Sequence, residues 1–135
     1  MKRILLLLVA FATILGASAK VTETTWKDLT KDLKSQKTDI AVVDVYATWC
    51  VPCKTYAPTF DAVSEQFPAV SFYRMDIDKN MGITDYIAVK SVPMTIIFYR
   101  VPGEKQPRVL SYPGVMSKED LTAMVEKAKS AVKGN

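Results

Sequence analysis

Histidine is absent from this chain of 135 residues, and cysteine occurs only twice, at Cys50 and Cys53. A structural zinc site needs four ligands, most often cysteine and histidine, so two cysteines cannot complete one. Aspartate or glutamate could ligate a metal in principle, but none is spaced for it. We therefore expect no metal site in this protein.

Long blocks of one charge are also missing. The 18 Lys and Arg residues and 14 Asp and Glu residues give a net charge of +4, and the two signs alternate along the chain. Without a basic block, nucleic acid is an unsuitable partner. No internal repeat, low-complexity segment or linker interrupts the sequence, so we expect residues 20–135 to form one compact domain, a monomer.

The N-terminus has the pattern of an export signal. Lys2 and Arg3 are followed by an almost entirely apolar run, Ile4–Leu15, and by the small residues Ala17-Ser18-Ala19. This pattern predicts a signal peptide over residues 1–19 and export, to the periplasm if the source is bacterial. The alternative is an uncleaved membrane anchor, for which the 16 residues of Ile4–Ala19 are fewer than the about 20 that span a bilayer.

Hydrophobic periodicity predicts an α/β domain. The near-continuous apolar run Ile40–Tyr46 fits a central strand that is buried on both faces. Helical spacing of apolar residues marks the segments 24–36, 54–67 and 117–132, the last beginning with a Ser-x-x-Asp capping pattern. The remaining expected elements are strands at 70–75, 94–99 and 109–112, a short helix at 81–88, and a short strand at Val21. This order predicts a mixed sheet covered by helices on both faces.

The segment Cys50-Val51-Pro52-Cys53 lies between the expected central strand and the next helix. A cysteine at a helix N-terminus meets unpaired backbone N–H groups and the positive end of the helix dipole, which stabilise a thiolate. The second thiol is near enough to resolve a mixed disulfide formed by the first. The spacing therefore indicates a dithiol/disulfide centre, in which we expect Cys50 to be the more exposed cysteine.

Two other interpretations of the cysteine pair remain open. A structural disulfide is one, although closing a loop of four residues contributes only about 2 kcal/mol by the chain-entropy relation. Half of a metal site is the other, and it lacks further Cys or His ligands.

The segment Val43–Lys54, followed by Ala57-Pro58, resembles the active-site segment of thioredoxins, and Ser91–Thr95 resembles the cis-proline loop of that family. The segments Arg74–Asp78 and Pro113-Gly114 also fall where the family would place comparable residues. The resemblance extends from about Val21 to Val132. It implies the thioredoxin fold, a central mixed β-sheet flanked by helices on both faces.

The resemblance implies catalytic roles for three residues. Cys50 would be the attacking nucleophile and Cys53 the buried resolving thiol. Asp44 would be the buried acid that takes the proton of Cys53. Because Asp44 interrupts an apolar strand, we expect a buried carboxylate without a partner, with its pKa raised by burial. The alternative is an aspartate at a strand end that faces water.

The resemblance also implies a substrate-binding groove. Pro93 would be cis and would form the groove with Val92, while Trp49 would border it; Val51 and Pro52 would tune the reactivity of the pair. The alternatives are a trans proline at the first residue of a strand for Pro93, and an ordinary core position for Trp49.

The sequence departs from the family pattern in places. Val-Pro stands between the cysteines where cytosolic thioredoxins have Gly-Pro. The Val-Pro dipeptide resembles that of some exported thioredoxin-like reductants. Arg74 stands where thioredoxins often carry a lysine near the buried acid, Ser91 replaces a glycine of the substrate groove, and Val101–Arg108 is a longer turn than usual. Strong oxidants of the family carry a histidine between the cysteines, and this chain has none.

The resemblance implies a thiol-disulfide oxidoreductase that reduces disulfides in substrate proteins without a bound cofactor, and the N-terminal signal pattern predicts that it is exported. Apocytochromes and misoxidised envelope proteins are the expected substrates, and a transmembrane dithiol donor is the expected source of electrons. The alternatives are an oxidase or isomerase of the same fold and a non-enzymatic binding module.

Overall fold

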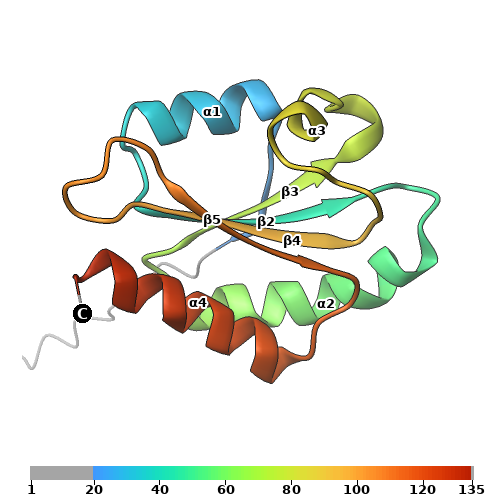
Figure 1. Cartoon of the computed structure of the whole chain (residues 1–135). Coiled ribbons are helices and arrows are strands. Elements are labelled where there is room, and N and C mark those ends of the chain that lie inside the picture. Colours follow the sequence, from blue (N-terminus) through green and yellow to red (C-terminus); the bar gives the residue numbers. More distant parts are fainter. Residues whose placement is uncertain (1–19, 135) are drawn as a thin grey trace, which may run out of the picture.

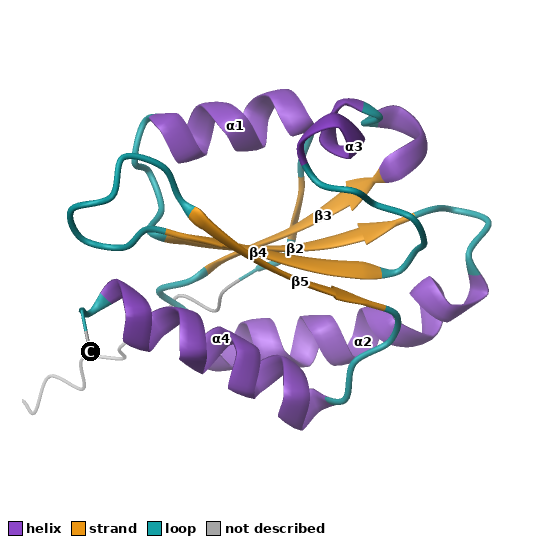
Figure 2. Ribbon diagram, in the orientation of Figure 1, coloured by secondary structure: helices purple, strands orange, loops and turns teal. Residues whose placement is uncertain are grey.

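The computed structural model describes residues 20–134, so the expected export signal at residues 1–19 lies outside the described residues. Figure 1 shows a central sheet with helices on both faces, and Figure 2 shows the same layers by type of element. In chain order the elements are β1 (Thr22–Glu23), α1 (Trp26–Lys34), β2 (Ile40–Tyr46), α2 (Val51–Gln66), β3 (Ser71–Asp76), the 3-10 helix η1 (Ile77–Lys79), α3 (Gly82–Tyr86), β4 (Met94–Tyr99), β5 (Arg108–Pro113) and α4 (Lys118–Val132).

The sheet is mixed, with the strand order β1-β3-β2-β4-β5. Strand β2 lies at its centre, parallel to β3 and antiparallel to β4. In this register Asp44 lies opposite Arg74 on one side and opposite Thr95 on the other. The α/β mixed sheet with helices on both faces is confirmed.

Each face of the sheet has its own hydrophobic core. Helices α1 and α3 cover one face, where Val43, Val45 and Met75 are fully buried. Helices α2 and α4 cover the other face, where Tyr56 and Phe60 pack under the sheet. Since successive side chains of a strand point to opposite faces, β2 needs apolar residues at nearly every position, as its sequence has.

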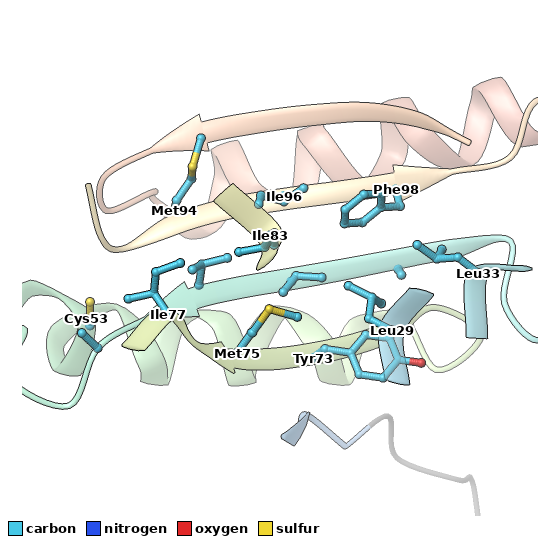
Figure 3. Packing of buried hydrophobic residues seen from close by; sticks show 14 of the residues in the cluster. Leu29, Leu33, Cys53, Tyr73, Met75, Ile77, Ile83, Met94, Ile96 and Phe98 are labelled. Carbon is cyan, nitrogen blue, oxygen red and sulfur yellow. The ribbon is translucent and has the colours of Figure 1, made fainter. Parts of the chain in front are cut away.

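Figure 3 shows the hydrophobic core on the α1 and α3 side of the sheet. In the core on the α1 and α3 side, Cys53, Ile77 and Met94 lie toward one end of the sheet, and Phe98 and Leu33 lie toward the other. The cysteine pair is thus at the end of the sheet where β2 finishes and β4 begins.

Helix ends follow local capping chemistry. The hydroxyl of Ser117 accepts the N–H of Asp120 at 3.0 Å, which confirms the capping pattern expected for α4. Such a cap typically contributes about 1 kcal/mol. Helix α2 begins at Val51, three residues earlier than the periodicity predicts, because proline in the first turn has a backbone preset for helix.

Among the described residues, no helix combines the length and the apolar character needed to cross a membrane.

Candidate active site

Cys50 and Cys53 form a disulfide at the N-terminus of α2. Cys50 is the N-cap residue, with extended backbone angles (φ −87°, ψ 109°), and its Sγ accepts the backbone N–H of Cys53 at 3.2 Å. A sulfur in this position meets the positive end of the helix dipole as well as this N–H. The same two features would stabilise a Cys50 thiolate once the disulfide is reduced.

The two cysteines are equally buried, each with 4% of its surface exposed, so the expectation that Cys50 is the more exposed is wrong for the disulfide form. Both residues belong to the hydrophobic core on the α1 and α3 side of the sheet. Their surroundings differ instead. Cys50 Sγ lies 3.6 Å from the carbonyl oxygen of Val92, whereas Cys53 lines a pocket of about 330 Å³ together with Asp44.

Asp44 lies in the middle of β2 with 1% of its surface exposed. Burial raises the pKa of Asp44 from 3.8 to about 6, because water no longer solvates the charged form, while Arg74 offsets part of that increase. Of the carboxylate oxygens, Oδ2 accepts the Nε–H of Arg74 at 3.2 Å, and Oδ1 has no partner among the described residues. The raised pKa agrees with the sequence-based expectation; the expected lack of a partner is wrong.

Arg74 connects Asp44 to the surface. It lies opposite Asp44 on the neighbouring parallel strand, and its Nη2–H donates to Oδ1 of the exposed Asp61 on α2 at 3.2 Å. Its guanidinium also lies 5.8 Å from the ring centre of Phe60. Sequence reasoning did not include Asp61. The signal available for it was helical spacing: Asp61 is eight residues after Cys53, so it lies two turns further along α2.

The Val92–Pro93 segment lies beside the disulfide. The peptide bond between Val92 and Pro93 is cis, Pro93 is buried and Val92 is half-buried. The Pro93 carbonyl accepts the N–H of Gly114 at 2.8 Å, which ties the segment to the end of β5. Gly114 has φ of +93°, a conformation that residues with a side chain seldom adopt. Val92 and Pro93 therefore lie next to Cys50, where the resemblance places them.

Trp49 and Val51 flank Cys50 in the sequence, and both are 69% exposed. The indole N–H of Trp49 donates to Oδ2 of Asp78 at 2.8 Å, which orients the ring outside the core. The core interpretation of Trp49 is thus wrong. Asp78 was missed as its partner, because it comes from the 3-10 helix η1 after β3, 29 residues further along the chain.

The described residues contain no group of three or more His, Cys, Asp or Glu side chains placed to hold a metal ion. The Cys50–Cys53 disulfide has different surroundings on its two sides. On one side, an exposed apolar surface and a backbone carbonyl adjoin Cys50. On the other side, a carboxylate that titrates near neutrality shares a pocket with Cys53.

The family model described as Thioredoxin matches residues 18–127 of this chain. Among curated proteins, thioredoxin from Borreliella burgdorferi is 40% identical over 70 residues, which are 51% of this chain and 57% of that protein. Thioredoxin-1 from Saccharomyces cerevisiae is 41% identical over 59 residues, covering 44% of this chain and 57% of that protein. The match thus spans less than two thirds of the length of these two relatives. Thioredoxin H3 from Arabidopsis thaliana is 32% identical over 110 residues, covering 80% of this chain and 88% of that protein.

Solved structures of thioredoxins also superpose on this chain. The reduced thioredoxin pre-protein of Schistosoma mansoni superposes with a TM-score of 0.67 at 31% identity, covering 82% of this chain and 99% of that one. Chloroplastic thioredoxin z superposes with a TM-score of 0.70 at 23% identity, covering 82% and 96% respectively, which supports the fold alone.

Proposed function

Because this chain belongs to the thioredoxin family, we propose that it is a protein-disulfide oxidoreductase that acts through Cys50 and Cys53. The observation that carries this proposal is the division of the site. Cys50 caps α2 beside Val92, and Cys53 shares a pocket with a carboxylate whose pKa is about 6. A structural disulfide needs neither feature.

The reaction begins with the reduced protein. The Cys50 thiolate, stabilised by the Cys53 N–H and the helix dipole, attacks one sulfur of a substrate disulfide. A mixed disulfide forms between Cys50 and that sulfur, and the other substrate sulfur leaves as a thiolate. An extended substrate would lie along the Val92–Pro93 segment beside Cys50, and the exposed Trp49 would border this surface.

Cys53 then resolves the mixed disulfide. Its thiol loses a proton, and the thiolate attacks Cys50 Sγ, which releases the second substrate sulfur as a thiolate and forms the Cys50–Cys53 disulfide. The substrate gains two electrons and the protein loses two. Asp44 is the acceptor for the Cys53 proton, because the two groups line one pocket and a pKa of about 6 leaves the carboxylate mostly ionised at neutral pH.

We further propose that the net direction is reduction of substrates after export. The support is sequence chemistry: Pro52 lies between the cysteines, no histidine is present to favour the reduced thiolate, and residues 1–19 have a signal-peptide pattern. Disulfide-bearing envelope proteins and apocytochromes would be the substrates, and a transmembrane dithiol donor would return the electrons, since disulfides form and persist in oxidising compartments.

Substrate trapping tests the proposed division of roles. Cys53→Ser should accumulate mixed disulfides with substrate proteins, because the attacking thiol remains and the resolving thiol is gone. The matched variant Cys50→Ser should accumulate none. Non-reducing electrophoresis of cells expressing each variant measures this, and equal trapping by the two variants would contradict the assignment.

A further inference from the structure

A second pocket lies at the end of the sheet away from the cysteines. Its volume is about 370 Å³, within the range of about 300–1,000 Å³ that ligand pockets occupy. It is bounded by α1, by the end of α3 and by the turn between β4 and β5, which lies beside the C-terminal end of α1 in Figure 1. Met94 lies with Cys53 toward the other end of the sheet, and Arg100 in this pocket is six residues further along the chain, or about 20 Å of extended strand.

One part of the pocket is aromatic. Trp26, Tyr86 and Phe98 lie in mutual contact, with ring centres 5.4 to 6.4 Å apart. Phe98 is fully buried, but Tyr86 is 54% exposed and Trp26 is not fully buried, although large aromatic rings gain most from burial. This cluster offers a flat apolar surface that the described residues leave partly uncovered.

The rest of the pocket is cationic. Lys34, Arg100 and Lys105 line it, and none of the described lining residues is acidic. The guanidinium of Arg100 donates one Nη2–H to the Leu33 carbonyl at 2.6 Å, while its buried Nε–H has no partner among the described residues. The nearby carboxylate of Glu104 is paired with Arg108.

The two parts are arranged along one line. Trp26 and Lys34 lie eight residues apart on the same stripe of α1, which separates them by about 12 Å along the helix axis. An occupant therefore needs an apolar ring at one end and a negative charge at the other. The basic side of the pocket comes in part from the turn Val101–Arg108, the turn that is longer than the family pattern.

We propose that this pocket binds a small aromatic carboxylate, with its ring on Trp26, Tyr86 and Phe98 and its carboxylate toward Lys34, Arg100 and Lys105. This site is separate from the cysteine pair, and the proposal does not depend on the direction of the redox reaction. Charge complementarity selects the acid, and the aromatic cluster selects the ring.

The test is a nuclear magnetic resonance titration of the full chain with 4-phenylbutyrate, its amide and 4-phenylbutylamine. We expect the acid to shift the Trp26 indole N–H signal and the backbone signals of Arg100 and Lys105. The amide should bind about tenfold more weakly or worse, since a charged hydrogen bond contributes about 1.5–3 kcal/mol, and the amine should not shift these signals.

Variants locate the binding. Lys34→Gln combined with Lys105→Gln should weaken 4-phenylbutyrate about fivefold, the effect of losing two exposed charge pairs. The control pair Lys118→Gln with Lys127→Gln, both on α4 across the sheet, should leave the affinity unchanged.

Each of these results would overturn the proposal: equal affinity for acid and amide, equal affinity in both variant pairs, signal shifts at Trp49 and Val92 only, or no shift up to the solubility limit. Binding of an acidic peptide in place of the small acid would overturn it as well.

Discussion

Arg74 donates its Nε–H to Oδ2 of Asp44 at 3.2 Å, from directly opposite on the neighbouring parallel strand. This ion pair keeps a carboxylate charged at physiological pH although it is 1% exposed. Burial outweighs the partner, since the pKa of Asp44 is raised to about 6 and not lowered. The proton acceptor that shares a pocket with Cys53 therefore has a pKa near neutrality.

The first prediction concerns stability and pH. Asp44 titrates at 3.8 when unfolded and at about 6 when folded, so between these values the folded protein binds more protons. The free energy of unfolding should thus fall as pH rises through this window, by on the order of 3 kcal/mol from this group, and stay lowered above it. Asp44→Asn should lack this decrease. Urea unfolding of the oxidised protein at about pH 4 and about pH 7 measures it. The same pH dependence in wild type and variant would show that Asp44 does not titrate as described.

The second prediction concerns the two neighbours of Asp44. Arg74 lowers the pKa of Asp44 and the charge of Asp61 raises it. Arg74→Met should therefore move the midpoint of the pH–rate profile for resolving a mixed disulfide to higher pH. Asp61→Asn should move it to lower pH, and Arg74→Lys, which keeps the charge, should lie closer to wild type than Arg74→Met. The measurement is the rate of thiol release from a preformed Cys50 mixed disulfide. Shifts of the same sign in Arg74→Met and Asp61→Asn would contradict this electrostatic account.

The third prediction concerns the nucleophile. In the reduced protein, Cys50 should react with iodoacetamide well below the pH of about 8.5 at which a free thiol ionises, because the helix N-terminus and the Cys53 N–H stabilise its thiolate. Cys53, in the first turn and facing the Asp44 pocket, should react much more slowly. Mass spectrometry of the alkylated peptides across a pH series separates the two. An ordinary thiol profile at Cys50 would remove the basis for its role as nucleophile.

The fourth prediction concerns turnover. Asp44→Asn keeps the shape of the side chain and removes the proton acceptor. It should slow the resolving step by at least about tenfold at neutral pH, since general base catalysis contributes about 10²–10⁴-fold. The attack of Cys50 on a substrate disulfide should change little, because Asp44 lies on the Cys53 side. Stopped-flow tryptophan fluorescence, measured in a Trp26→Phe background so that Trp49 gives the signal, separates the two steps, and equal slowing of both would contradict a role confined to Cys53.

Much of the fold follows from the sequence because its signals are local. The apolar run Ile40–Tyr46 identified the central strand with the bounds that the structure has, and Ser117 identified the start of α4. The start of α2 was placed too late, at Lys54, because apolar spacing marks only the buried face of a helix. Its first turn is fixed by Pro52 and the Cys50 cap, and Val51 and Pro52 are exposed.

The parts of the site that the sequence did not predict depend on three-dimensional register. The resemblance placed a basic residue, Arg74, near the buried acid, but its hydrogen bond to Asp44 depends on how β3 aligns with β2, which spacing along the chain does not specify. The bond from Trp49 to Asp78 likewise joins a loop to the residues after another strand. The equal burial of Cys50 and Cys53 in the disulfide depends on how both residues pack against the core, which their spacing in the sequence does not specify.

The reduction potential of the Cys50–Cys53 pair, measured by equilibration with glutathione buffers, tests the proposed reductase most directly. With Pro52 between the cysteines and no histidine in the chain, the potential should lie nearer the about −270 mV of thioredoxin than the about −120 mV of a strong periplasmic oxidant. A potential above about −180 mV would contradict the reductase and favour an oxidase or isomerase.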